Sequence, residues 1–262
     1  MTRIISVYNQ KGGVGKTTTV INLSTALADT SLKKKKVLVL DMDPQGNTTS
    51  GLGVDKESLT ADLYQVLLGN ATMDQAKKDI QNSHLHLIPS SPDLTGFEIE
   101  ALGLEDRNLR LKKPLEAVKD RYDYIFIDCP PSLGMLSLNA LAASDSVLIP
   151  IQTEFFALEG VSQLVSTLEM IRKSINPALE VEGVLLSMVD RRTNLAQDVE
   201  AEVKKYFGDR VFKTVIPRNV RLAEAPSYGE SIIHFDRFSK GAQAYINLAK
   251  ELKKRKDEQM KK

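Results

Sequence analysis

Ten residues near the start of the chain constrain its fold more than any other stretch: Asn9-Gln10-Lys11-Gly12-Gly13-Val14-Gly15-Lys16-Thr17-Thr18. The apolar run 4–8 precedes them, and Val20, Leu23 and Leu27 follow at the spacing of one buried helical face. Strand, glycine-rich loop and helix, in this order, are the setting of a phosphate-binding loop. The sequence therefore predicts such a loop here.

The loop carries the groups that bind phosphate. Glycines let the backbone curl so that successive N–H groups point at phosphate oxygens, and the following helix adds the partial positive charge of its N-terminus. We expect Lys16 to reach the β- and γ-phosphates and the Thr17 hydroxyl to hold Mg²⁺. The expected phosphate-binding residues are Gly12, Gly13, Val14, Gly15, Lys16, Thr17 and Thr18. An ordinary glycine-rich turn between a strand and a helix is the alternative interpretation.

The loop departs from the usual phosphate-loop pattern at one position. That pattern has a glycine six residues before the lysine, where this chain has Gln10. An additional lysine, Lys11, stands at the start of the loop instead.

Carboxylates follow two further apolar runs. Residues 37–40 lead into Asp41 and Asp43, and residues 124–127 lead into Asp128. The C-terminal ends of buried parallel strands form the edge at which α/β proteins bind ligands. We expect Asp128 to hold Mg²⁺ through water or to accept a hydrogen bond from Thr17. The next residues, Cys-Pro-Pro-Ser-Leu-Gly, suit a switch that senses the γ-phosphate, with a plain strand-to-helix turn as the alternative.

The composition is that of an ordinary globular protein. The 262 residues suit a single domain, 1–262, and no repeat or low-complexity linker divides them. No apolar run is long enough to span a bilayer, and because a strand begins at Arg3 we expect no signal peptide or N-terminal accessory domain. The single cysteine, Cys129, excludes an internal disulfide and suits a reducing cytoplasm. With a net charge of +1, any nucleic-acid binding must come from a local basic surface.

Strand-like runs alternate with helical patterns along the whole chain. This alternation predicts an α/β fold with a doubly wound, mainly parallel β-sheet flanked by helices. Residues 211–216 are expected to form the last strand. His84 and His86 are expected on the solvent face of an edge strand rather than at a metal site, because no third ligand follows at a suitable spacing. The basic segment 253–262 is expected to fray, since Met260 is its only apolar residue.

These motifs resemble the ParA/Soj family of the deviant Walker A (ParA/MinD) group of P-loop NTPases. The pairing of Lys11 with Lys16 is typical of that group, and the resemblance covers essentially the full length. It also rests on residues 41–47, 128–134, 154–160, 190–194 and 215–227. The last segment, Val-Ile-Pro-Arg-Asn-Val-Arg-Leu-Ala-Glu-Ala-Pro-Ser, is together with 190–194 the most specific to chromosomal ParA proteins.

The resemblance implies an ATPase switch whose cofactors are ATP and Mg²⁺. With ATP bound, such proteins form a sandwich homodimer that binds double-stranded DNA nonspecifically and moves a cargo in chromosome or plasmid segregation. A ParB/Spo0J-like partner stimulates their slow ATP hydrolysis. The implied location is the cytoplasm, on the nucleoid, with no stable membrane association.

The resemblance also assigns roles to single residues. Lys11 reaches across to the partner's ATP phosphates, so that dimerisation completes the charge neutralisation that phosphoryl transfer needs. Lys16 acts with Lys11 in catalysis, and Asp43 lies near the attacking water and the Mg²⁺ shell. Met188 and Pro217 provide backbone contacts near the adenine. The implied Mg²⁺ residues are Thr17, Asp43 and Asp128.

The DNA contacts fall on basic side chains. The family motifs place them at Arg192 and Arg218, and we add Arg221 and Lys205. Such side chains would bind phosphates by counterion release, which gives a salt-sensitive and sequence-independent affinity. Nothing in the chain resembles base readout, and there is no room before Arg3 for a helix-turn-helix.

Two other functions share the nucleotide motifs, and a third is excluded. A MinD-like membrane-associated positioning ATPase needs a helix with an apolar face, which the tail beyond Leu252 lacks. A small-molecule ATP-dependent ligase does not account for residues 215–227. A relative of the nitrogenase iron protein needs two cysteines per chain to share a [4Fe–4S] cluster, and this chain has only Cys129.

Overall fold

Continuous apolar runs in the strands give the central sheet two buried faces. The computed structural model describes residues 2–30, 34–81, 84–154, 157–190 and 192–259. Ile4 and Ile125 contribute to one hydrophobic cluster, whereas their neighbours Ile5 and Phe126 contribute to the other. Because successive strand residues point to opposite faces, strands made entirely of apolar residues require cover on both sides.

The described residues form a seven-stranded sheet in the order β3-β4-β2-β5-β1-β6-β7. The strands are β1 (Arg3–Val7), β2 (Val37–Asp41), β3 (Lys78–Ile80), β4 (Leu85–Ile88), β5 (Tyr124–Asp128), β6 (Ser146–Gln152) and β7 (Glu180–Ser187). All neighbouring pairs are parallel except β3 and β4. The predicted doubly wound, mainly parallel sheet is confirmed.

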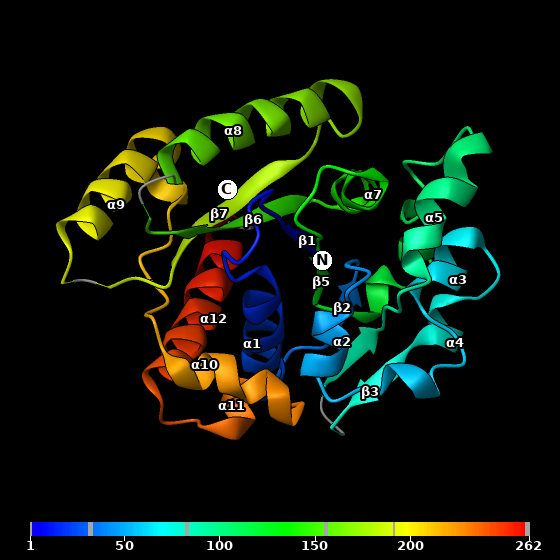
Figure 1. Ribbon diagram of the computed structural model, residues 1–262, viewed down its shortest axis with the longest axis horizontal. Coiled ribbons are helices and arrows are strands. Elements are labelled where there is room, and N and C mark those ends of the chain that lie inside the picture. The colour runs from blue at the N-terminus through cyan, green and yellow to red at the C-terminus, as the bar shows by residue number, and fades with distance from the viewer. Residues whose placement is uncertain (1, 31–33, 82–83, 155–156, 191, 260–262) are drawn as a thin grey trace.

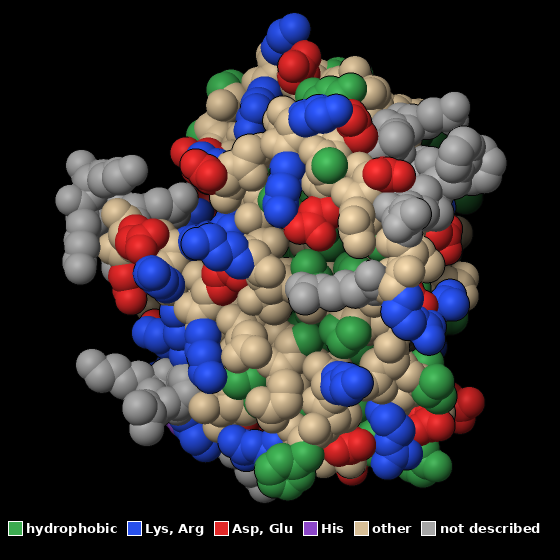
Figure 2. Space-filling model, turned by 90° about the vertical axis from the view of Figure 1, so that its left-hand side faces the viewer, with side chains coloured by type: hydrophobic (Ala, Val, Ile, Leu, Met, Phe, Trp, Pro, Cys, Tyr) green, Lys and Arg blue, Asp and Glu red, His purple; other side chains and the backbone are tan. Residues whose placement is uncertain are grey.

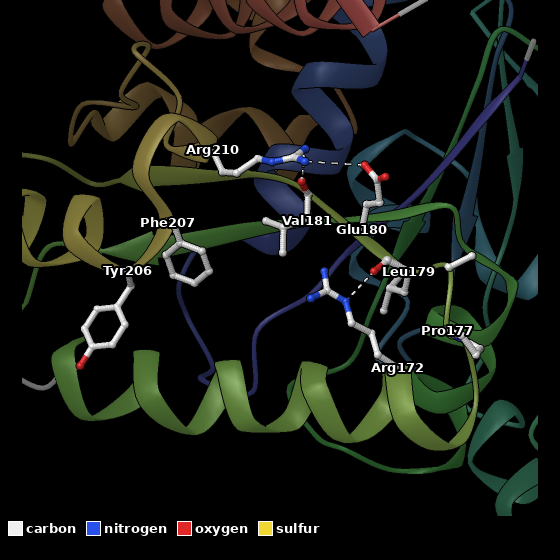
Figure 3. Close-up of a pocket in the computed structure, with 9 residues that line it drawn as sticks. Arg172, Pro177, Leu179, Glu180, Val181, Tyr206, Phe207 and Arg210 are labelled. Atoms are coloured by element: carbon white, nitrogen blue, oxygen red, sulfur yellow. Dashed lines mark hydrogen bonds and ion pairs between the residues drawn. The ribbon is translucent and has the colours of Figure 1, made fainter. Parts of the chain in front are cut away.

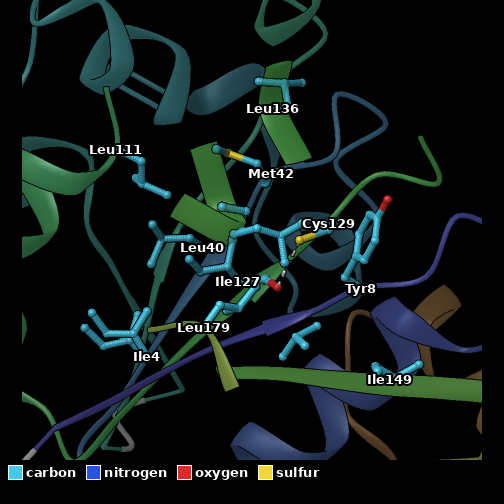
Figure 4. Packing of buried hydrophobic residues seen from close by; sticks show 14 of the residues in the cluster. Ile4, Tyr8, Leu40, Met42, Leu111, Ile127, Cys129, Leu136, Ile149 and Leu179 are labelled. Atoms are coloured by element: carbon cyan, nitrogen blue, oxygen red, sulfur yellow. Dashed lines mark hydrogen bonds between the residues drawn. The ribbon is translucent and has the colours of Figure 1, made fainter. Parts of the chain in front are cut away.

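Helices cover both faces of this sheet (Figure 1). One face carries α1 (Lys16–Asp29), α10 (Val220–Glu224), α11 (Ile232–Phe235) and α12 (Lys240–Gln259). The other carries α3 (Leu63–Leu68), α4 (Met73–Ala76), α5 (Leu94–Glu100), α6 (Lys112–Glu116), α7 (Met135–Ala143), α8 (Ala157–Ser174) and α9 (Asn194–Phe207). The short helix α2 (Asn47–Gly51) follows β2. Tyr8, Met42 and Cys129, each just beyond the end of a strand, are buried in the second face's cluster, so the strand ends rest on a packed core (Figure 4).

Residues 211–216 do not form the strand that the sequence predicts. Within the segment, Val211 forms an isolated bridge with β7, and the N–H groups of Phe212 and Ile216 donate to carbonyl groups of β7. The backbone N–H groups of Lys213 and Thr214 donate instead to the Glu251 carboxylate of α12, at 2.8 and 2.9 Å. These two donors are therefore diverted from a sheet ladder to a helix side chain.

The prediction that His86 lies on an edge strand is also wrong, because β3 pairs antiparallel with β4 and takes the edge position. His86 is consequently half-buried, and its Nδ1 lies 2.9 Å from the Tyr122 hydroxyl. Burial lowers the pKa of His86. Among the described residues, no group of three His, Cys, Asp or Glu side chains is arranged to hold a metal ion.

The basic C-terminal segment is helical where we expected fraying. The Arg255 guanidinium lies 4.2 Å from the centre of the Phe212 ring, and the Lys256 ammonium lies 4.3 Å from that of Tyr124. These cation–π contacts attach the last turns of α12 to the body of the protein, and the helix continues to Gln259. The prediction is wrong for residues 253–259, and residues 260–262 lie outside the described part. No helix within that part has the length and apolarity to cross a membrane.

Candidate nucleotide-binding site

The loop between β1 and α1 has the backbone geometry of an anion cradle. Gly13 and Gly15 have φ values of 73° and 89°, a left-handed conformation that glycine adopts without steric cost. Gly15 is the N-cap of α1, no side chain caps this helix end, and its first turn contains no acidic residue. The first N–H groups of a helix have no partner within it, so they are free for an anion here.

Two side chains hold this loop in place, one at its start and one at the end of β7. The Asn9 side chain donates to the Pro150 carbonyl on β6 at 2.8 Å and accepts from the Lys11 N–H at 3.0 Å. The Ser187 hydroxyl at the end of β7 donates to the Val14 carbonyl at 2.8 Å. Sequence reasoning did not find the contacts with Pro150 and Ser187, which join residues far apart in the chain.

Lys16 is buried against the loop. Its Nζ donates to the Lys11 carbonyl at 3.1 Å, and only 7% of the residue is exposed. Burial lowers the pKa of Lys16, while the carboxylates of Asp128 and Asp43 oppose this effect. A phosphate placed along the loop would add further counter-charge beside this buried ammonium group.

Asp128 meets two hydroxyl groups at the end of β5. Its Oδ2 accepts from Thr17 at 2.8 Å and from Thr48 at 2.7 Å. Its Oδ1 is buried without a hydrogen-bond partner in the described structure. Burial raises the pKa of Asp128 to about 6, although the two hydroxyl groups act in the opposite direction.

The partnerless oxygen tests whether these residues fit Mg²⁺. A buried carboxylate oxygen without a partner is costly, and a hydrated Mg²⁺ would satisfy it directly or through water. The hydroxyl of Thr17 lies on the same carboxylate, as a magnesium site of this type requires. The residues therefore fit Mg²⁺. Thr48 was not predicted; its only signal was its place next to the motif 41–47.

The two carboxylates after β2 have different environments. Asp41 is fully buried: its Oδ2 accepts from the N–H and the hydroxyl of Thr49, at 2.8 and 2.7 Å. Burial, together with the charge of Asp128, raises the pKa of Asp41 to about 7. Asp43 is 9% exposed and accepts from the Gln45 N–H at 2.9 Å. Because the Asp41 carboxylate already accepts two hydrogen bonds from Thr49, Asp43 is the carboxylate of this pair that is better able to bind a water molecule.

Lys11 lies on the rim of the site. Its Nζ is 3.3 Å from Glu154 Oε2 of the same chain, and the two side chains are 42% and 48% exposed. An ion pair this exposed is weak, about 0–1 kcal/mol, so the lysine is readily available to a stronger anion.

The two residues assigned to the adenine are brought together by the fold. Val189 forms an isolated bridge with Pro217, and Met188 precedes it with a φ of 51°. Met188 directly follows Ser187, whose hydroxyl binds the phosphate loop. Met188 therefore lies on a segment that contacts the loop, and Pro217 lies beside that segment, which is compatible with their expected role.

The four candidate DNA-binding residues do not form one cluster. Arg192 binds Asp190 through NH2 at 2.6 Å, and the charge of Arg218 also lowers the pKa of Asp190, which falls to about 2 chiefly through its hydrogen bonds to Arg192. Lys205 pairs with Glu202 in the last turn of α9, about 16 Å along the helix axis from its start. Arg221 pairs with Glu224 and Asp236. The structure thus brings only Arg192 and Arg218 together.

A separate cavity of ≈ 700 Å³ lies between the start of β7 and the C-terminal ends of α8 and α9. Arg172 and Arg210 extend into it from different elements, and Tyr206 and Phe207 form its apolar wall (Figure 3). It contains none of the residues that the sequence assigns to nucleotide or DNA.

Comparison with known proteins agrees with the geometry of the phosphate loop. A family model described as an AAA domain matches residues 2–181. The sporulation initiation inhibitor protein Soj of Bacillus subtilis (strain 168) is 54% identical over 252 residues, which are 96% of this chain and 98% of that protein. The chromosome partitioning protein ParA of Myxococcus xanthus is 49% identical over 253 residues, 97% of this chain and 88% of that protein. The chain belongs to the Soj/ParA family of chromosome-partitioning ATPases.

A solved structure shows the same family fold with nucleotide. Cobyrinic acid a,c-diamide synthase from Mycobacterium smegmatis, with a bound ATP analog and magnesium, superposes with a TM-score of 0.84 at 36% identity. The match covers 95% of this chain and 93% of that one. The resemblance to Soj/ParA ATPases and the P-loop fold are confirmed, whereas the roles of single residues stay predictions.

Proposed function

We propose that the protein is an ATP-dependent DNA-partitioning switch. Its ATP-bound sandwich dimer binds double-stranded DNA nonspecifically, and slow hydrolysis, stimulated by a ParB/Spo0J-like partner, releases the DNA. The cycle drives the segregation of a chromosome or plasmid in the cytoplasm, on the nucleoid. The proposal rests on family membership together with the geometry of the phosphate loop.

The observation that carries the ATPase part is the Asp128 carboxylate, whose Oδ2 accepts from Thr17, whose Oδ1 has no partner in the described structure, and whose charge acts on Lys16. Here the cofactors are ATP and Mg²⁺. The loop 11–18 holds the phosphates, with Lys16 neutralising the β- and γ-phosphates. Thr17 and Asp128 would hold Mg²⁺, which would supply positive charge to stabilise the transferred phosphoryl group. Asp43 orients the attacking water and contributes to the Mg²⁺ shell.

Lys11 links the nucleotide to dimerisation. Its weak contact with Glu154 is exchangeable, and a second copy's ATP phosphates provide a more strongly charged acceptor. Two chains facing each other through these loops would each donate a lysine to the other's nucleotide. Without the γ-phosphate, like charges face each other across the interface and oppose closure.

Basic residues after β7 support the DNA-binding part. Arg192 and Arg218 are exposed side chains on adjoining segments. Figure 2 shows the side of the molecule that carries α9, where lysine and arginine side chains are widespread but interspersed with acidic ones. This mixture suits a small number of phosphate contacts that salt weakens, rather than tight binding by a uniformly basic surface.

A MinD-like membrane function finds less support in α12. Leu248, Ala249 and Leu252 are buried against the body of the protein, so they are not available to a lipid surface. A helix that binds a membrane needs its apolar face free.

The deciding experiment measures DNA binding over a salt series, with ATP, with ADP and without nucleotide. We expect binding only with ATP, a steep decline with salt, and its loss in Lys11→Ala. Lys250→Ala is the matched control, because Lys250 is an exposed lysine on α12, outside the phosphate loop. Binding that ignores nucleotide, or a Lys11→Ala variant equal to the control, would overturn the proposal. Liposome binding that depends on residues 245–262 would favour the membrane function instead.

A further inference from the structure

We propose that Glu98 positions the switch loop, residues 129–134, by capping the N-terminus of α7. This rests on the proposed function, because the loop is taken to sense the γ-phosphate. The loop leaves the end of β5 at Asp128 and enters α7 at Met135. The position of α7 therefore fixes one end of the loop, and the magnesium-binding carboxylate fixes the other.

The cap comes from outside α7. Its N-cap residue is Gly134, which has no side chain to accept from the free N–H groups of the first turn. Glu98 on α5 takes this role, since its Oε1 accepts from the Met135 N–H at 3.0 Å. A carboxylate is favoured at this position because the N-terminus of a helix carries a partial positive charge.

Gly134 supplies an independent observation. Its φ of −98° is open to any residue, so backbone conformation does not demand a glycine. A Cβ atom built at this position would lie 2.5 Å from Glu98 Oε1, closer than van der Waals contact allows. The missing side chain is therefore the space in which the Glu98 carboxylate reaches the helix.

Further hydrogen bonds make the arrangement stiff. The buried Asn139 side chain of α7 donates to the Arg107 carbonyl at 2.7 Å and accepts from the Leu111 N–H at 3.2 Å, so the segment 94–111 holds α7 at two points. The Ser137 hydroxyl donates to the Ser132 carbonyl at 2.5 Å and ties the loop to α7. If the Glu98 carboxylate were displaced, α7 would shift and the loop attached to it would move as well.

The test compares the affinities for a fluorescent ADP and for a fluorescent non-hydrolysable ATP analogue, both with Mg²⁺. In Glu98→Ala we expect the preference for the ATP analogue to fall about three- to tenfold, the range of a lost cap contact. The ADP affinity should stay unchanged, because ADP lacks the γ-phosphate. Glu98→Gln keeps an acceptor oxygen and should retain most of the preference. Glu100→Ala is the matched control: Glu100 lies two residues further on and accepts from the Tyr64 hydroxyl rather than from α7.

A double-mutant cycle guards against a purely structural effect. Gly134→Ala should displace the carboxylate and reproduce the phenotype of Glu98→Ala, yet add little when Glu98 is already alanine. Additive effects, an unchanged preference in Glu98→Ala, or equal losses of ADP and ATP-analogue binding would overturn the inference. A wild type that binds neither nucleotide would overturn the proposed function itself. If the wild type prefers the ATP analogue to ADP and Glu98→Ala keeps the same preference, the inference alone is overturned.

Discussion

The sharpest test of the magnesium-site geometry is Thr48→Val. Valine has nearly the shape of threonine, and Thr48 is fully buried, so the substitution removes one hydroxyl group and admits no water in its place. The lost bond is the 2.7 Å contact to Asp128 Oδ2. We therefore expect a loss of stability that depends on the charge of Asp128.

The magnitude follows from the two charge states of this carboxyl group. A hydrogen bond to a charged group contributes about 1.5–3 kcal/mol to the free energy of unfolding, and one between neutral groups contributes about 0.5–1.5 kcal/mol. We expect the larger loss at pH 8, where Asp128 is ionised. The smaller loss applies at pH 5, where Asp128 is largely protonated because its pKa is raised to about 6.

The direction of the pH dependence follows from proton linkage. An aspartate in the unfolded chain titrates near about 3.9. Between that pH and the raised folded pKa of about 6, the folded protein keeps a proton that the unfolded chain has released, so stability falls as pH rises through this window. Removing the Thr48 hydroxyl withdraws a donor that favours the ionised form, and the folded pKa rises further. The deficit of the variant must therefore grow as pH rises through and beyond 6.

Urea unfolding at pH 5 and pH 8, followed by circular dichroism, measures this deficit. Thr25→Val is the matched control, because the buried Thr25 hydroxyl donates to the neutral carbonyl of Ile21 at 2.8 Å. Its effect should be the same at both pH values. A Thr48→Val deficit that does not change with pH, or that follows the control, would refute the reasoning.

Three further predictions concern the loop, the water and the DNA. Gly15→Ala should lower the free energy of unfolding by about 1–2 kcal/mol because of the φ of 89°, whereas Gly103→Ala, with open space around its Cβ, should not; thermal melts compare the two. Asp43→Asn should keep ATP-dependent DNA binding but slow phosphate release at least about 100-fold, and an unchanged rate would remove Asp43 from catalysis. Arg218→Glu should weaken DNA binding and flatten its salt dependence, whereas Arg121→Glu, ion-paired to Asp74, changes the net charge equally and should have a smaller effect. Equal effects of the two charge reversals on DNA retardation would argue against a contact at Arg218.

The sequence predicted the phosphate loop and the family because their signals are local. Glycines at fixed spacing and an apolar run before them are read directly from neighbouring residues. The same holds for Asp128, whose place follows from the buried strand that it ends. Its contact with Thr17 could also be expected, because β5 lies beside β1 in this fold.

Local patterns failed where a distant group takes over a hydrogen bond or covers a side chain. Residues 211–216 have the composition of a strand, but Glu251 takes two of their N–H groups. The basic segment after Leu252 has the composition of a frayed end, but Phe212 and Tyr124 offer aromatic faces to Arg255 and Lys256. No window of neighbouring residues contains either partner.

The sequence by itself determined the alternation of most strands and helices, the phosphate loop and the carboxylates at the ends of β2 and β5. Those features depend on backbone conformation and on the periodicity of apolar residues, which act over a few residues. Only the tertiary structure decided that Thr48 meets Asp128 across 80 residues of chain, and that Glu98 caps α7. These contacts depend on which segments the packed sheet brings side by side. Their directional hydrogen bonds leave no periodic trace in the sequence.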